Sequence, residues 1–89
     1  MILLDEVSYV KRAKNRLVVL RALERALMPS ELVMKIYGRS SNTRFNIVSQ
    51  ALSELVGAKL ARVVNPKSRT GRLYTLTDKG GKVIKILGK

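Results

Sequence analysis

Uncharged polar side chains recur along one side of the segment from residue 42 to residue 56. They are Asn42, Thr43, Asn46, Gln50 and Ser53. Amide and hydroxyl groups both donate and accept hydrogen bonds, and Asn and Gln can pair bidentately with the edge of adenine. In a chain this rich in Lys and Arg, a helix face turned only to solvent would be expected to carry more charge. The segment is therefore a candidate for reading nucleic-acid bases, and the alternative is an ordinary solvent-exposed surface.

Residue patterns that could support catalysis or metal binding are few. The chain has no Cys and no His, which removes disulfides, thiolate metal sites and the commonest general base. Ser8 and Lys11 have the spacing of a Ser-x-x-Lys acyl-transfer motif, but no companion motif accompanies them in this short chain. The only adjacent carboxylates, Asp5 and Glu6, suit the first turn of a helix. We therefore expect no enzymatic activity, no cofactor and no metal site.

Charge is the most informative total of the composition. Eighteen Lys and Arg stand against six Asp and Glu, for a net charge of +12, which predicts a polyanionic partner. An anionic membrane would need a basic amphipathic helix with bulky aromatic residues, and the chain has no Trp and one Phe. No apolar run is long enough to cross a bilayer. These features predict a cytoplasmic protein that binds nucleic acid and is associated with the nucleoid.

The polar side chains need a helix over residues 42–56 to bring them onto one face. Five apolar residues repeat at helical spacing on the other side and predict a stripe buried in the core: Phe45, Val48, Ala51, Leu52 and Leu55. Upstream, Pro29 begins a short helix that ends at Gly38, and a polar turn follows. A short helix, a turn and a second helix with a polar outer face form a helix-turn-helix pattern. Met28 stands where a Ser or Thr cap is usual, and its loss should cost about 1 kcal/mol unless another group compensates.

The segments on either side of this pattern are predicted to be a helical N-terminus and a C-terminal hairpin with a last helix. From Asp5, apolar residues recur at helical intervals as far as Leu27, as one long helix or two shorter ones broken near Lys14 and Asn15. Residues 60–64 and 73–76 are short runs with β-branched residues that flank a basic, turn-rich tip, which predicts a β-hairpin.

The last predicted helix begins at Asp78 and is capped by Thr77. Gly80 and Gly81 fall in its first turn, where each costs about 1 kcal/mol relative to Ala. No linker divides the chain, so residues 1–89 are predicted to form a single domain, α+β but mostly α.

Three stretches in this order resemble one known family. They are Pro29-Ser30-Glu31-Leu32, Val48-Ser49-Gln50-Ala51-Leu52-Ser53-Glu54-Leu55 and Gly71-Arg72-Leu73-Tyr74-Thr75-Leu76-Thr77-Asp78-Lys79-Gly80. The chain is similar to the small archaeal winged helix-turn-helix transcription regulators related to the ArsR and MarR groups, over nearly its whole length. The resemblance implies a three-helix core, a β-hairpin wing and a C-terminal helix.

The resemblance also implies where DNA would bind. The helix at 42–56 would enter the major groove, and the wing at 65–72 would lie along the backbone or the minor groove. The helix contacts would come from the residues of its first three turns and the turn before it: Ser41, Asn42, Thr43, Arg44, Asn46, Ser49 and Gln50. The wing contacts would come from Lys67, Arg69 and Arg72, through counterion release or by reading groove width.

Three functional hypotheses follow from these observations. The first is a sequence-specific transcription regulator, expected to be a homodimer on a two-fold symmetric site of double-stranded DNA. The second is a chromatin-like architectural protein that coats DNA without sequence preference, motivated by the excess of positive charge. The third is a winged-helix module that binds protein or structured RNA within a larger complex.

Overall fold

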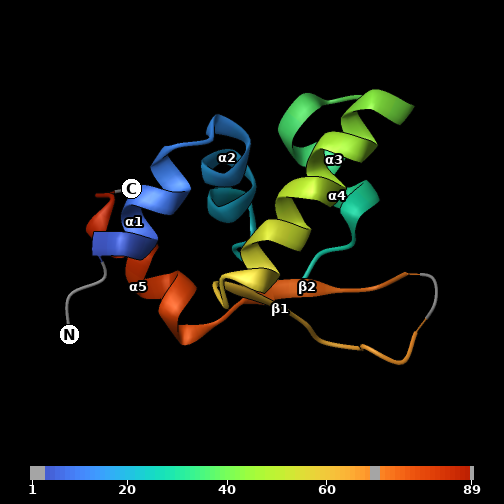
Figure 1. Ribbon diagram of the computed structural model, residues 1–89. Coiled ribbons are helices and arrows are strands. Elements are labelled where there is room, and N and C mark those ends of the chain that lie inside the picture. The colour runs from blue at the N-terminus through green and yellow to red at the C-terminus, as the bar shows by residue number, and fades with distance from the viewer. Residues whose placement is uncertain (1–3, 69–70, 89) are drawn as a thin grey trace.

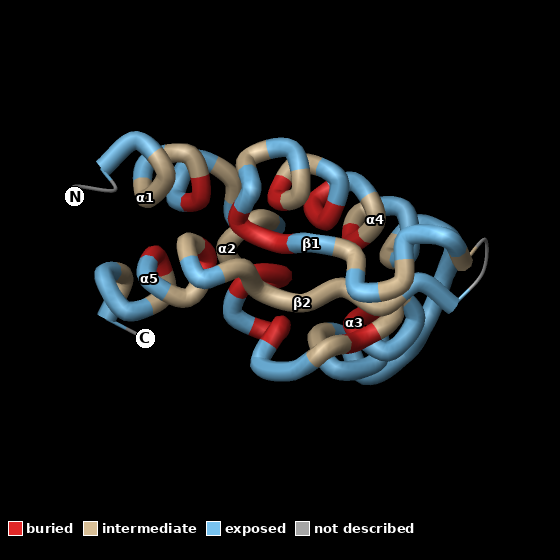
Figure 2. The backbone as a smooth tube through the Cα atoms, turned by 90° about the horizontal axis from the view of Figure 1, so that it is seen from below, coloured by how far each residue is buried: buried red, intermediate tan, exposed pale blue. Residues whose placement is uncertain are grey.

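The computed structural model describes residues 4–68 and 71–88, which form five helices and one two-stranded antiparallel sheet (Figure 1). In chain order the elements are α1 (Leu4–Lys11), α2 (Lys14–Ala22), α3 (Pro29–Tyr37), α4 (Asn42–Gly57), β1 (Ala61–Val63), β2 (Tyr74–Leu76) and α5 (Asp78–Ile86). The predicted class, mostly helical with one hairpin near the C-terminus, is confirmed. Figure 2 shows α4 on one side of the hairpin and α3 on the other, with α1 and α5 beyond the end of the strands at which β2 leads into α5.

The N-terminal apolar segment forms two helices, and the second ends earlier than its apolar pattern suggests. Ala13 is extended, with φ −132° and ψ 116°, and separates α1 from α2. The helical spacing continues to Leu27, but α2 ends at Ala22. Leu23 and Leu27 are buried nonetheless, at 1% and 3% exposure. A helical prediction through Leu27 is therefore wrong, because burial alone does not distinguish a helix from an extended segment.

Leu27 instead pairs with the hairpin. Its backbone nitrogen donates to the Tyr74 oxygen over 3.0 Å, and the Tyr74 nitrogen donates back to the Leu27 oxygen over 2.8 Å. The segment before α3 thus forms a single antiparallel bridge to β2. This pairing fixes the start of α3 against the base of the hairpin, although the two are far apart in the sequence.

The start of α3 shows how the missing Ser or Thr cap is compensated. The Met28 nitrogen donates to Oε1 of Glu31 over 2.7 Å, which satisfies one backbone donor at this helix end. Pro29 follows as the first helical residue. At the other end Gly38 adopts a left-handed conformation with φ 78°, which ends the helix as predicted.

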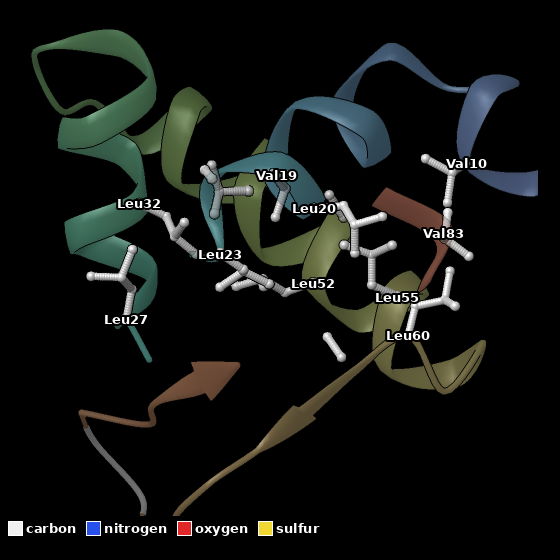
Figure 3. Packing of buried hydrophobic residues seen from close by; sticks show 14 of the residues in the cluster. Val10, Val19, Leu20, Leu23, Leu27, Leu32, Leu52, Leu55, Leu60 and Val83 are labelled. Atoms are coloured by element: carbon white, nitrogen blue, oxygen red, sulfur yellow. The ribbon is translucent and has the colours of Figure 1, made fainter. Parts of the chain in front are cut away.

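The core lies between α2 and α4 and is closed by α1, the hairpin and α5 (Figure 3). Its fully buried side chains include Val10 of α1, Leu20 of α2, Leu52 and Leu55 of α4, and Val83 of α5. The predicted stripe of α4 is confirmed for Val48, Ala51, Leu52 and Leu55.

Phe45 is the exception in that stripe, because it remains 43% exposed. It lies at the first turns of α4, where the side chain borders an open recess between α3 and the hairpin instead of the core. The prediction that Phe45 belongs to the buried core is therefore wrong.

The hairpin pairs Ala61 with Leu76 and Val63 with Tyr74. Both strands are shorter than predicted, although the Val64 nitrogen still donates to the Leu73 oxygen over 2.7 Å beyond them. Thr77 caps α5 as predicted, since its Oγ1 accepts a hydrogen bond from the Gly80 nitrogen over 3.0 Å. The hairpin and α5 are therefore joined directly, with no intervening loop.

Candidate nucleic-acid interface

The polar side of α4 faces away from the core. Asn42, Thr43, Asn46, Gln50 and Ser53 are all exposed. Ser49 is partly buried beside this exposed strip, and Arg44 is partly buried at the start of the helix. Four predicted helix residues, Asn42, Thr43, Asn46 and Gln50, thus lie on one outward face of α4 with Ser49 beside it, whereas the Arg44 side chain lies over Tyr37.

The start of α4 is organised by Ser41. Its Oγ accepts a hydrogen bond from the Arg44 nitrogen over 3.1 Å and a second from Nη1 of Arg44 over 3.3 Å. The Arg44 guanidinium also lies over the Tyr37 ring, 5.5 Å from its centroid. Ser41 therefore has a structural role as the cap of α4, and it holds the Arg44 charge near the helix start.

Gln50 is held at the middle of α4 by an acidic neighbour. Its Nε2 lies 3.5 Å from Oε2 of Glu54, one turn further on. The other carboxylate oxygen of Glu54 accepts from Nε of Arg16 over 2.9 Å. This ion pair offsets the negative charge of Glu54, the one acidic residue of α4, while the carboxylate also contacts the Gln50 amide.

The base of the hairpin tip is held by Asn65. The Leu73 nitrogen donates to its Oδ1 over 2.7 Å, and its Nδ2 donates to the Gly71 oxygen over 3.2 Å. Nε of Arg72 donates to the Ser68 oxygen over 2.9 Å, which fixes the direction of this exposed side chain. Lys67 is exposed in the turn. Arg69, the third predicted wing residue, lies outside the described residues.

An open recess of about 400 Å³ lies between α4 and the hairpin. Ser49 and Phe45 border it from α4, and Arg72 and Tyr74 border it from the hairpin. The start of α3 completes the wall with Met28, Pro29 and Ser30. Two predicted site residues from distant parts of the chain, Ser49 and Arg72, thus face the same concavity.

Phe45 and Ser30 were not predicted as site residues, and both line this recess. Phe45 carries the apolar spacing of the core stripe, so its type and position favoured burial. Ser30 stands at the start of a helix, where small polar residues are ordinary. At neither position does the sequence alone distinguish a functional residue from a structural one.

The acidic residues are largely used within the fold. Hydrogen bonding from Lys79, with its positive charge, lowers the pKa of Glu6, and Lys35 lowers the pKa of Glu24 in the same way. Together with Arg16–Glu54, these pairs are the ion pairs found within residues 4–68 and 71–88. Arg44, Lys67 and Arg72 take part in none of them, so their charges remain available to a partner.

Other kinds of site find little support in the part of the chain that the structure describes. No three His, Cys, Asp or Glu side chains there gather closely enough to hold a metal ion. No described helix is both long enough and apolar enough to cross a membrane. Comparison of the chain with protein-family models, curated proteins and solved structures found no match.

Proposed function

We propose that this chain is a winged helix-turn-helix protein that binds double-stranded DNA as a sequence-specific transcription regulator. The observation that carries the proposal is the recess shared by α4 and the hairpin, which is lined by the Ser49 hydroxyl and the Phe45 ring of the helix and by the Arg72 cation of the hairpin. In this arrangement α4 enters the major groove, and the hairpin follows the neighbouring backbone or minor groove. Figure 1 shows the start of α4 and the described residues that follow β1 and precede β2 extending toward the same side of the molecule.

Base reading is assigned to Asn46 and Gln50, the exposed amides of α4. An amide pairs bidentately with N6 and N7 of adenine in the major groove. Ser49 contributes a shorter hydroxyl on the flank next to the hairpin. Arg44 and Thr43, at the helix start, are assigned to phosphate together with the hydroxyl proton of Ser41.

Phe45 adds an apolar contact to this set. Because it is 43% exposed beside Ser49, its ring is available to a partner in the groove. Aromatic and small apolar side chains contact the C5 methyl group of thymine, which marks A·T pairs in the major groove. An amide for adenine and a ring for thymine methyl together favour a site rich in A·T pairs.

The wing supplies affinity that does not depend on sequence. Lys67 and Arg72 carry exposed charges, and Arg69 adds a third by its position in the sequence. Each phosphate neutralised by such a cation releases condensed counterions, which makes binding dependent on salt. A homodimer on a two-fold symmetric site would double these contacts, and light scattering of the purified chain tests that state.

The second candidate is an architectural protein that coats DNA, and the net charge of +12 is the observation that favours it. The two functions differ in sequence preference. Selection of bound duplexes from a random pool, followed by competition in about 150 mM salt, separates them. We expect a selected duplex to bind more than about tenfold tighter than random DNA. A smaller ratio with strong binding would favour coating, and no duplex binding would favour a protein or RNA partner.

A further inference from the structure

A cluster of cations marks the junction of α1 and α2. Lys11 ends α1, Lys14 begins α2, and Arg12 lies between them; we call these three residues the α1–α2 corner. All three side chains are exposed, as is the neighbouring Asn15. None of the three forms an ion pair with any acidic side chain in the described part of the chain. The corner therefore presents three positive charges to solvent without an internal partner.

The backbone junction that carries the corner borders one flank of α4. A second recess, of about 180 Å³, is lined by Ala13 and Asn15 at the junction and by Ile47 and Gln50 of α4. The recess beside the hairpin is lined instead by Ser49 on the other flank of α4. Residues 47 and 49 are about 200° apart around a helix, so the two recesses lie on opposite sides of the exposed strip.

Arg16 holds the corner in place relative to α4. It donates from Nε to Glu54 over 2.9 Å and from Nη1 to the Tyr9 backbone oxygen over 2.8 Å. Its guanidinium also stacks on the Tyr9 ring, 3.8 Å from the centroid. One side chain therefore ties α1, α2 and α4 together, and the backbone that carries the corner cations keeps a fixed position relative to α4.

A helix in the major groove has a sugar–phosphate backbone on each side. The hairpin accounts for one side only. We propose that the α1–α2 corner binds the phosphates of duplex DNA on the side of the groove opposite to the hairpin. The proposal rests on the proposed function, because it assumes that α4 lies in the groove. It predicts that the protein grips both backbones, with Gln50 held between the two sets of cations.

The test compares two triple variants with the same loss of charge. The first changes the corner, Lys11→Gln, Arg12→Gln and Lys14→Gln. The second changes Arg21→Gln, Lys82→Gln and Lys85→Gln, three exposed cations on α2 and α5. Arg21 borders a recess with Leu76 and Ile84, away from α4. Thermal unfolding first establishes that both variants fold as the wild type does.

Affinity for a random 20-bp duplex is then measured over a series of salt concentrations. We expect the corner variant to bind the duplex about tenfold or more weakly at low salt. The slope of log K against log salt should become less steep by about 2 to 3. The second variant should lose less than about 1 in slope. Equal slopes for the two triple variants would overturn the corner assignment while leaving the proposed function intact. Failure of the wild type to bind any duplex would overturn both.

Phosphate ethylation interference on a selected duplex locates the contacts. The wild type should show two clusters of essential phosphates, one on each side of the groove read by α4. The corner variant should lose one cluster, and a Lys67→Gln, Arg72→Gln variant should lose the other. A single cluster in the wild type, or loss of the same cluster in both variants, would contradict a grip on opposite backbones.

Discussion

Gly80 of α5 packs directly against the backbone carbonyl of Leu60, so closely that a Cβ atom on Gly80 would overlap the oxygen. The same oxygen accepts a hydrogen bond from the Thr77 nitrogen over 3.1 Å. The Thr77 hydroxyl donates in turn to the Lys59 oxygen over 2.7 Å. The first turn of α5 is thus seated on the chain that enters β1, which explains a glycine where helix propensity disfavours one.

Replacement of Gly80 by Ala should therefore destabilise the protein. We expect a loss of about 2 kcal/mol or more in the free energy of unfolding, because the methyl group meets rigid backbone. Gly81→Ala is the matched control, since a Cβ atom there meets nothing within 4 Å. That change should raise stability by up to about 1 kcal/mol. Urea denaturation followed by circular dichroism measures both, and similar effects of the two changes would contradict the packing argument.

Removal of the two amides from α4 should weaken sequence preference. For Asn46→Ala with Gln50→Ala, we expect the preference for a selected duplex over random DNA to fall by about 1 to 3 kcal/mol per adenine contact. The salt dependence should stay unchanged, because neither side chain carries charge. Ser53→Ala, on the same face but nearer the helix end, is the control. Competition binding that leaves the preference intact would show that α4 does not read the bases.

Phe45 should matter more for recognition than for stability. Because the ring is 43% exposed, Phe45→Ala should cost less than Leu52→Ala, whose side chain is 1% exposed. Truncation of a buried Leu costs about 2 to 5 kcal/mol. The wild type should also prefer a selected duplex over the same duplex with uracil in place of thymine, which lacks only the methyl group. That preference should vanish in Phe45→Ala, and its persistence would rule out the methyl contact.

The ion pair between Glu6 and Lys79 joins α1 to α5 over 3.0 Å. The hydrogen bond from Lys79 lowers the pKa of Glu6 below its ordinary value of 4.5. A lowered folded pKa stabilises the protein above the unfolded pKa, and this contribution is lost as pH falls through the folded value. Lys79→Met should therefore be less stable than the wild type at pH 7, and the difference should disappear in acid.

The pair of Glu24 and Lys35 supplies a contrast for this prediction. Nζ of Lys35 donates both to Oε1 of Glu24 over 2.9 Å and to the Ala22 backbone oxygen over 2.8 Å. The backbone bond does not depend on titration of a carboxyl group. Lys35→Met should thus remain less stable than the wild type even at low pH. Unfolding free energies measured from pH 7 to pH 2 test both variants, and a difference for Lys79→Met that persists in acid would contradict the assignment.

Local signals in the sequence were sufficient to predict where most helices begin and end. The cap at Thr77 and the stop at Gly38 act through neighbouring residues, so the chain itself specifies them. The same signals could not end α2 at Ala22. Leu23 and Leu27 keep the spacing of a helix, and only the backbone pairing of Leu27 with Tyr74 makes that segment extended.

The sequence by itself determined the mostly helical class, the exposed polar strip of α4 and the excess of positive charge. Each depends on residue type and helical period, which act over short separations. Tertiary structure alone decided that Phe45 is exposed, that Ser49 and Arg72 face one recess, and that Arg16 fixes the α1–α2 corner beside α4. These arrangements join residues far apart in the chain, and which surfaces meet depends on how all the helices pack at once.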